Sequence, residues 1–169
     1  MSIRWIGAIL ILISCGGIGF SMAAAYIAQE KSVRALLSAL EFMESDLKYR
    51  LTPLPELCES AGERAGGQIG SVFKKVVRIL KQRESADVSS CMDCAIAAVG
   101  LHGAAQLHMQ TLGETLGRFD LDGQLQGIAS VKSDCQRTLE ELSNNRESRL
   151  RSYQTLGLCA GAALAILLI

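Results

Sequence analysis

Apolar positions along this chain form two uncharged runs at its ends and helical stripes between them. No charged side chain occurs from Trp5 to Gln29 or from Ser152 to Ile169. As helices, these runs would reach about 36 Å and about 27 Å, against a hydrocarbon core of about 30 Å. The pattern therefore predicts transmembrane helices at residues 5–28 and 152–169, on either side of a middle domain at residues 30–151.

The middle domain repeats apolar residues at spacings of three and four, which is typical of amphipathic helices. The first stripe continues the N-terminal run: Val33, Leu36, Leu37, Leu40, Met43, Leu47 and Leu51. A short helix should start at "TPLPE", run to about Arg64 and break at Gly66-Gly67, and a long final helix should begin near Asp120. The alternation expected of strands is absent. We therefore predict an all-α fold, a small six-helix-type bundle between N-terminal and C-terminal transmembrane helices.

The composition and the charge distribution indicate on which side of the membrane the middle domain should lie. The chain is 49% hydrophobic, which is high for a soluble domain, and its 17 basic and 17 acidic residues cancel. This balance disfavours nucleic acid as a partner. The basic residues nearest the inner sides of the two runs are Lys31, Arg34, Arg146, Arg149 and Arg151, and Arg4 alone lies beyond them. Positive-inside bias therefore predicts a cytoplasmic middle domain.

Cys15 raises an alternative to the first transmembrane helix. Leu12-Ile13-Ser14-Cys15 fits the box at which bacterial lipoproteins are cleaved and lipidated. Processing there would leave a lipid-anchored extracytoplasmic helical protein modified at Cys15. The apolar run continues to Ala25 instead of turning polar, which favours an uncleaved span. The mass of the membrane-extracted protein would separate the two.

Motifs that carry chemistry are sparse. Cys91-Met92-Asp93-Cys94 has the C-x-x-C spacing of zinc ligands and of redox dithiols. The nearest histidines, His102 and His108, do not supply the second paired spacing that a zinc site needs, and no strand precedes the motif. We expect reduced cysteines, no metal, no cofactor and no catalytic residues, and hence a protein that is not an enzyme.

Two polar features of the middle domain are candidate interaction sites. One is the basic face of the helix that starts near Ile69, which would contact anionic lipid or an acidic partner, with plain solvation as the alternative. Its residues are Lys74, Lys75, Arg78 and Lys81. The other is the turn that contains Asp120 and Gln124, for which the structural alternative is a helix N-cap at Asp120.

Small residues in the two uncharged runs are tentative packing sites. Gly16 and Gly17 lie in the first run, and Gly157 and Gly161 form a G-x-x-x-G in the second. Small residues let helix backbones approach closely in lipid, so the runs would pack on each other or on partner helices. Ordinary glycine enrichment in membrane helices is the alternative.

Four segments in this order resemble the stage III sporulation protein AB family of endospore-forming Firmicutes. They are "IGAILILISCGGIGF", "TPLPE", "LGETLGRFDLDGQ" and "YQTLGLCAGAALAILLI". The most specific part is L-G-x-x-L-G-x-x-D-x-x-x-Q, from Leu112 to Gln124. A tryptophan associated with the region before that motif is missing, since Trp5 is the only one in this chain.

The resemblance implies a function that composition and spacing do not reach. The family's middle domain is similar to the cytoplasmic domains of the inner-membrane platform protein of type II secretion systems and type IV pili, which are six-helix bundles. The protein would lie in the mother-cell membrane around the forespore, in a secretion-like complex. Its expected partners are an AAA-type ATPase, the other stage III complex proteins and further copies of itself. We therefore expect a membrane platform that recruits a cytoplasmic ATPase.

Overall fold

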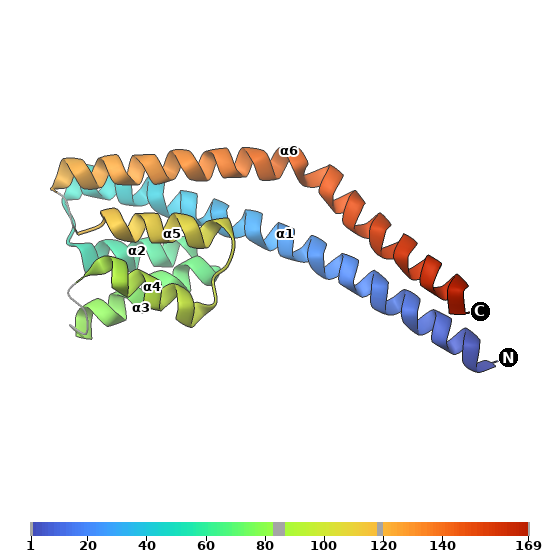
Figure 1. The fold of residues 1–169 in the computed structure, drawn as a ribbon. Coiled ribbons are helices and arrows are strands. Elements are labelled where there is room, and N and C mark those ends of the chain that lie inside the picture. Colours follow the sequence, from blue (N-terminus) through green and yellow to red (C-terminus); the bar gives the residue numbers. More distant parts are fainter. Residues whose placement is uncertain (1, 83–86, 118–119, 169) are drawn as a thin grey trace. The chain divides into compact units, whose positions relative to one another are not determined.

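The part of the chain that the structure describes consists of α-helices and the connections between them, and it contains no strand. This computed structural model describes the backbone of residues 2–82, 87–117 and 120–168, and the side chains of residues 17, 20–82, 87–117, 120–144, 155 and 159. The helices are α1 Ser2–Arg50, α2 Leu54–Ala65, α3 Gly67–Gln82, α4 Val88–Val99, α5 Ala104–Thr115 and α6 Leu121–Leu168 (Figure 1). The predicted all-α fold, with four short helices between two long ones, is confirmed.

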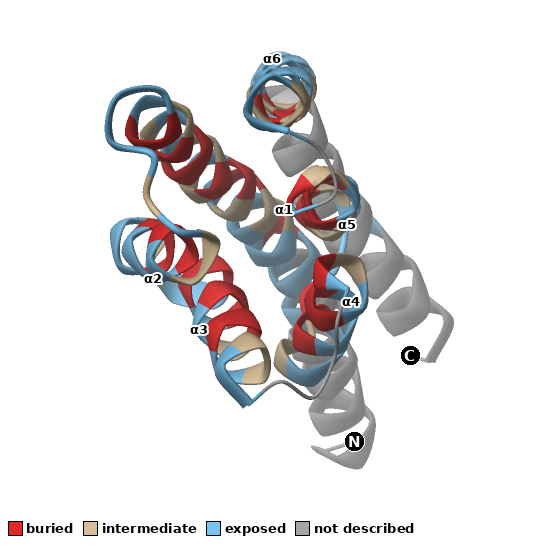
Figure 2. Cartoon of the chain, turned by 90° about the vertical axis from the view of Figure 1, so that its left-hand side faces the viewer, coloured by how far each residue is buried: buried red, intermediate tan, exposed pale blue. Residues whose placement is uncertain are grey.

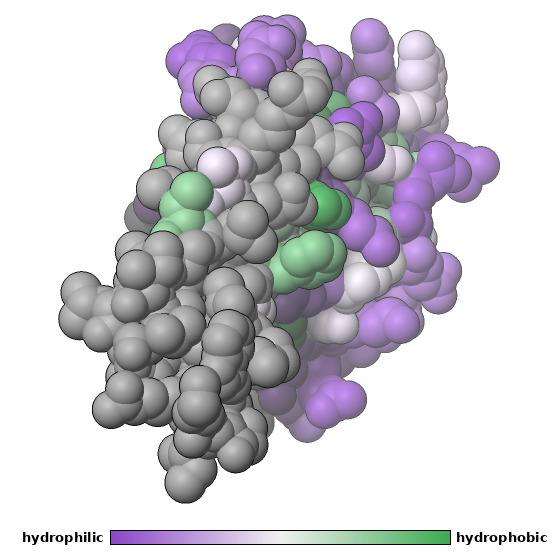
Figure 3. Space-filling view, turned by 90° about the vertical axis from the view of Figure 1, so that its right-hand side faces the viewer, coloured by the Kyte–Doolittle hydropathy of each residue, from purple (hydrophilic) through white to green (hydrophobic). Residues whose placement is uncertain are grey.

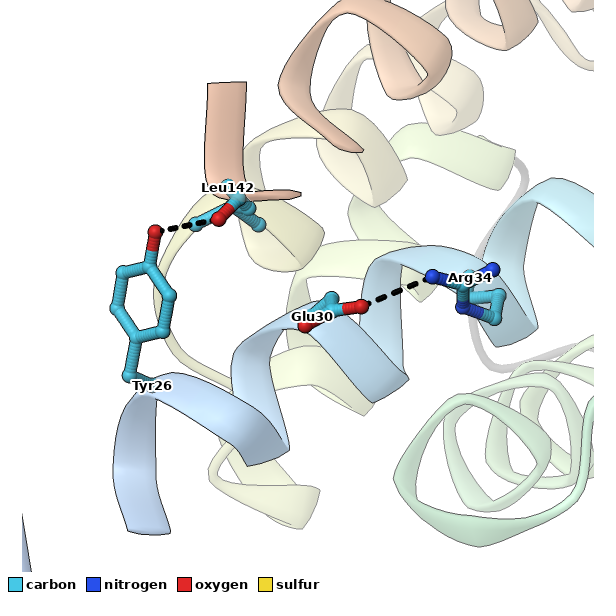
Figure 4. Close-up of polar contacts among 4 residues, drawn as sticks. All are labelled: Tyr26, Glu30, Arg34 and Leu142. Atoms are coloured by element: carbon cyan, nitrogen blue, oxygen red, sulfur yellow. Dashed lines mark hydrogen bonds and ion pairs between the residues drawn. The ribbon is translucent and has the colours of Figure 1, made fainter. Parts of the chain in front are cut away.

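The chain divides into two compact units. Unit 1 comprises Met1–Ala28 and Glu141–Ile169, and unit 2 comprises Gln29–Glu140. Inside unit 1, the Tyr26 hydroxyl donates a hydrogen bond of 2.8 Å to the carbonyl oxygen of Leu142 (Figure 4). Because a carbonyl oxygen has two lone pairs, this bond joins α1 to α6 without requiring the loss of a helical hydrogen bond.

The two predicted transmembrane helices are not supported by the structure. Among the residues that it describes, no helix combines the length and the apolar character needed to cross a membrane. Most side chains of residues 5–28 and 152–169 lie outside the described residues. The described part of unit 1 exposes three large apolar side chains, Phe20, Met22 and Ile27. Figure 3 shows one face of the molecule, where hydrophobic side chains reach the surface among hydrophilic ones.

The core of unit 2 is built from the apolar stripes of its helices. On α1, Val33, Leu36 and Leu40 are completely buried, at the spacing that places residues on one helix face. On α3, Phe73 is the largest fully buried side chain of the described residues. Figure 2 shows the buried sides of α1 to α5 turned toward one another, so these stripes share one core.

The first half of α6 closes unit 2 by lying antiparallel beside the second half of α1 (Figure 1). The ammonium group of Lys132 on α6 pairs with the carboxylate of Glu44 on α1. On the opposite side of α1, the Arg64 guanidinium of α2 lies 4.9 Å from the centre of the Phe42 ring. Long-range polar contacts therefore reinforce the apolar core on two sides of α1.

Two glycines bring α2 and α3 into backbone contact. A Cβ atom on Gly70 would lie 2.5 Å from the carbonyl oxygen of Gly62, and one on Gly62 would lie 2.8 Å from the Cβ of Phe73. Real Cβ atoms do not come that close to a backbone oxygen. Only glycine at these positions lets α3 seat against α2 with Phe73 in the core.

The apolar stripe predicted on the first helix is wrong at its last member. Leu51 lies beyond the end of α1 and is 65% exposed, with a backbone φ of 54°. Pro53 disfavours helical geometry at the residue before it, so the helix ends and the chain turns at Leu51. Glycine is the usual residue in this left-handed conformation, which costs a leucine about 1–2 kcal/mol.

Candidate interaction surfaces

The outward face of α3 carries basic residues and no acidic ones. Lys74, Arg78 and Lys81 are exposed and Lys75 is half-buried. They lie opposite the buried stripe that includes Phe73. Both the apolar and the basic residues recur at spacings of three and four, so each set occupies its own face of the helix. The structure thus brings the four candidate contact residues together on one surface of α3.

The basic face of α3 borders a row of carboxylates on α2. The Lys81 ammonium lies 2.9 Å from a carboxylate oxygen of Glu59, and both side chains are about half exposed. Glu56 and Glu63 are exposed on the same helix. An exposed pair of this kind is worth at most about 1 kcal/mol, so it orients Lys81 more than it stabilises the fold.

Three cations of this face remain open to a partner. Lys74, Lys75 and Arg78 form no ion pair with any residue that the structure describes. A partner's carboxylates would therefore not have to displace an internal anion at these positions. We call Lys74, Lys75 and Arg78 the open basic face.

The turn between α5 and α6 is built from the L-G-x-x-L-G-x-x-D segment. Its two leucines, Leu112 and Leu116, are completely buried. A Cβ atom on Gly113 would lie 2.8 Å from the Cβ of Met92, so α5 packs directly on α4 there. Each of these residues therefore serves packing.

Gly117 makes the turn itself. Its φ is 76°, and a Cβ atom there would lie 2.9 Å from Val88 Cγ2 and 3.5 Å from Leu54 Cδ2. Both the backbone conformation and the space around it call for glycine. The turn thus packs against the first residues of α2 and α4, Leu54 and Val88.

Asp120 caps α6. Its carboxylate Oδ1 accepts a hydrogen bond of 3.0 Å from the backbone N–H of Gly123, and its carbonyl oxygen accepts one of 2.9 Å from the N–H of Gln124. The N-cap expected at Asp120 is confirmed, since it satisfies an N–H that has no partner within the helix. A role of Asp120 and half-buried Gln124 in binding a partner stays a prediction.

Asp120→Ala should lower the free energy of unfolding of the full chain by about 1 kcal/mol, because the Gly123 N–H loses its acceptor. Urea unfolding followed by circular dichroism measures the change. Asp122→Ala is the matched control, because Asp122 lies in the same first turn and its carboxylate makes no hydrogen bond or ion pair to a described residue. If Asp120 only caps the helix, partner binding should survive both changes. Loss of binding by Asp120→Ala at unchanged stability would instead make the turn a contact site.

The C-x-x-C motif does not present two thiols to one site. Cys91 is 1% exposed within the core, whereas Cys94 is exposed.

Two other cysteines, Cys58 and Cys135, are buried in the core. Burial raises the pKa of Cys58 to about 12, and burial together with the charge of Asp134 raises the pKa of Cys135 to about 12. Both thiols therefore stay protonated, which is the unreactive form. Within the described residues, no three His, Cys, Asp or Glu side chains are grouped to hold a metal ion.

The two histidines lie in different environments. His108 is buried on α5, with Nε2 3.0 Å from the hydroxyl of Thr138 on α6. Burial lowers the pKa of His108, and the nearby charge of Asp134 opposes that shift in part. His102 is exposed in the connection between α4 and α5. His108 therefore serves the contact between α5 and α6, and the two rings build no common site.

The glycines of the uncharged runs are mostly outside the described residues. A Cβ atom on Gly17 would meet no atom of the described residues within 4 Å. The surroundings of Gly16, Gly157 and Gly161 are not described, and neither is the side chain of Cys15. Packing at these four glycines stays a prediction.

The corner between α1 and α2 is a surface that sequence reasoning missed. Tyr49 is 77% exposed at the end of α1, and Leu51 follows in the turn. The Lys48 ammonium lies 5.9 Å from the centre of the Tyr49 ring. The signal that could have revealed this corner is Pro53, because a proline two residues after Leu51 ends the helix before the last apolar position of the stripe.

Comparison with known proteins points in one direction. The model of the family described as stage III sporulation protein AB matches residues 4–169. Stage III sporulation protein AB of Bacillus subtilis (strain 168) is 22% identical over 169 residues, which cover 98% of this chain and 99% of that protein. A solved structure of a stage III sporulation protein AB has a TM-score of 0.60 at 18% identity and covers 69% of this chain and 94% of its own. That structure shares the fold.

Proposed function

This chain belongs to the stage III sporulation protein AB family, and we propose that it is a non-enzymatic platform of the sporulation complex that links mother cell and forespore. The family and its Bacillus subtilis relative carry sporulation in their names. The observation that carries the platform function is the open basic face on α3, which a packed bundle presents to solvent. Such a face suits recruitment of another protein.

The proposed platform is held in the mother-cell membrane by the two ends of the chain. Both ends are helical and both carry a long run without charged residues. Exposed Phe20, Met22 and Ile27 support this anchoring, because large apolar side chains favour a lipid environment over water. Unit 2 would then lie in the cytoplasm, where the basic residues beside both runs favour it.

The absence of catalysis is part of the proposal. The thiols of Cys58 and Cys135 are buried and protonated, and the His108 ring is occupied by its contact with Thr138. A nucleophile or general base needs a reachable, suitably ionised group. These residues support a structural role for the bundle.

The proposed partner of the open basic face is the cytoplasmic AAA-type ATPase of the same complex. Lys74 and Arg78 are four residues apart, so their charges lie one helical turn from each other and match a row of carboxylates. Complementary charge raises the association rate and sets the orientation of two proteins. The other stage III proteins are proposed to assemble around this pair.

Charge reversal tests the platform directly. The full-length chain carrying Lys74→Glu, Lys75→Glu and Arg78→Glu should bind the purified ATPase about tenfold more weakly or worse, because three attractive contacts become repulsive. Binding is measured by titration at two salt concentrations. The wild-type affinity should fall as salt rises, since exposed charges are screened.

A matched control reverses exposed cations on other helices, Lys31→Glu on α1 and Arg137→Glu on α6. These changes should leave ATPase affinity within about twofold of wild type. Equal affinity of wild type and the α3 triple variant would exclude the open basic face. Failure of the wild-type chain to bind the ATPase at all would sink recruitment as its function.

A further inference from the structure

The corner between α1 and α2 holds an apolar side chain in a strained, exposed position. Among the described residues, Leu51 is the only one other than glycine with a positive φ, at 54°. Its side chain is 65% exposed, so burial within the chain does not offset the strain. The turn out of α1 explains the positive φ, but glycine or asparagine would adopt it at lower cost, so the fold does not require leucine at this position.

Leu51 belongs to a small surface of mixed character. Tyr49, two residues earlier, is 77% exposed, which is the largest exposure of a large apolar side chain among the described residues. Lys48 is exposed beside the Tyr49 ring, and the Arg50 guanidinium reaches Asp46 only at 3.8 Å. We call Lys48, Tyr49, Arg50 and Leu51 the corner surface. It offers two apolar groups and two cations in four consecutive residues.

The corner surface lies at one extreme of unit 2. The α1 helix enters this unit at Gln29 and runs unbroken to Arg50, a rise of about 32 Å. Leu54, just past the corner, would lie 3.5 Å from a Cβ atom on Gly117, so the corner adjoins the turn between α5 and α6. Figure 2 shows the connection from α1 to α2 exposed at this end.

We propose that the corner surface docks a soluble protein partner whose surface places carboxylates around an apolar pocket. Tyrosine and leucine side chains that leave water on binding supply the affinity, and tyrosine is common at such anchor positions. Lys48 and Arg50 match the carboxylates, which fixes the charge of the partner. The proposal rests on the platform function, because the soluble partner in the test is the ATPase that the platform is proposed to recruit.

Leu51→Asn in the full-length chain separates binding from folding. Asparagine tolerates the left-handed conformation better than leucine, so the melting temperature should stay equal or rise. Affinity for the purified ATPase, measured by titration, should fall about tenfold through loss of the apolar group. Tyr49→Ser should weaken binding in the same way. Leu107→Asn is the matched control, because Leu107 is 63% exposed on α5, away from the corner surface, and binding should not change.

The outcomes are distinct. Wild-type affinity in both Leu51→Asn and Tyr49→Ser overturns the corner surface while the platform stands. A chain that does not bind the ATPase in any form overturns the platform and this inference together. A lower melting temperature for Leu51→Asn assigns the leucine to stability and overturns its docking role. Loss of a wild-type dimer in sedimentation, with ATPase binding intact, would make a second copy the occupant and overturn the partner proposed.

Discussion

Gly70→Ala is expected to lower the free energy of unfolding by about 2–3 kcal/mol. Its new Cβ atom would lie 2.5 Å from the carbonyl oxygen of Gly62, which belongs to the backbone of α2 and cannot swing away. Overpacking of this kind costs about 1–3 kcal/mol or more and here outweighs the better helix propensity of alanine, about 1 kcal/mol. Urea unfolding of the full chain measures the loss.

Ser71→Ala is the control for this change, because Ser71 is the next residue on α3 and is exposed. Its free energy of unfolding should stay within about 0.5 kcal/mol of wild type. A stable Gly70→Ala chain would mean that α2 and α3 can separate at little cost. The open basic face would then not be rigidly held, since α3 carries it.

Gly117→Ala is expected to cost about 2–3 kcal/mol for two reasons that add. Alanine is strained at a φ of 76°, and its Cβ atom would lie 2.9 Å from Val88 Cγ2. The backbone part is about 1 kcal/mol or slightly more, and the contact adds a similar amount. The measurement is again urea unfolding of the full chain.

Gly100→Ala isolates the backbone part of that cost. Gly100 has nearly the same φ, 70°, but its Cβ atom would have only His102 Nε2 nearby, at 4.0 Å. Gly100→Ala should therefore lose only about 1 kcal/mol. Equal losses for Gly100→Ala and Gly117→Ala would show that Val88 yields freely. The L-G-x-x-L-G-x-x-D segment would then not depend on the close fit between α5 and α4.

Two residues of the L-G-x-x-L-G-x-x-D segment show what this family motif does in the fold. Gly117 and Asp120 both act on the turn between α5 and α6, one through its conformation and one through its cap. Both residues therefore have a structural role in the turn, and a contact of Asp120 or Gln124 with a partner stays a prediction. The surfaces proposed for partners, the open basic face and the corner surface, lie outside the motif.

Much of the candidate site could be read from α3 alone. Its basic residues and its buried residues occupy opposite sides because both follow the helical period, so a local pattern predicts which side chains face solvent. The pairing of Lys81 with Glu59 could not be predicted. It depends on the chain reversing at Gly66 and Gly67, which brings residues 22 positions apart to 2.9 Å.

The C-x-x-C motif shows the opposite case. Its spacing alone is compatible with two thiols acting together, since residues three apart lie near each other on a helix. Packing against the other helices buries Cys91 and leaves Cys94 in solvent. The different exposure of the two cysteines results from contacts with other helices, and the spacing within one helix does not predict those contacts.

The sequence by itself determined the helical class, the order and approximate ends of the helices, the cap at Asp120 and the buried stripes of α1 and α3. These features follow from interactions within about one turn of helix, where spacing and propensity act. Tertiary structure alone decided that α2 and α3 meet at Gly62 and Gly70, and that Cys91 is buried while Cys94 stays in solvent. Those outcomes depend on where distant segments of the chain come to lie.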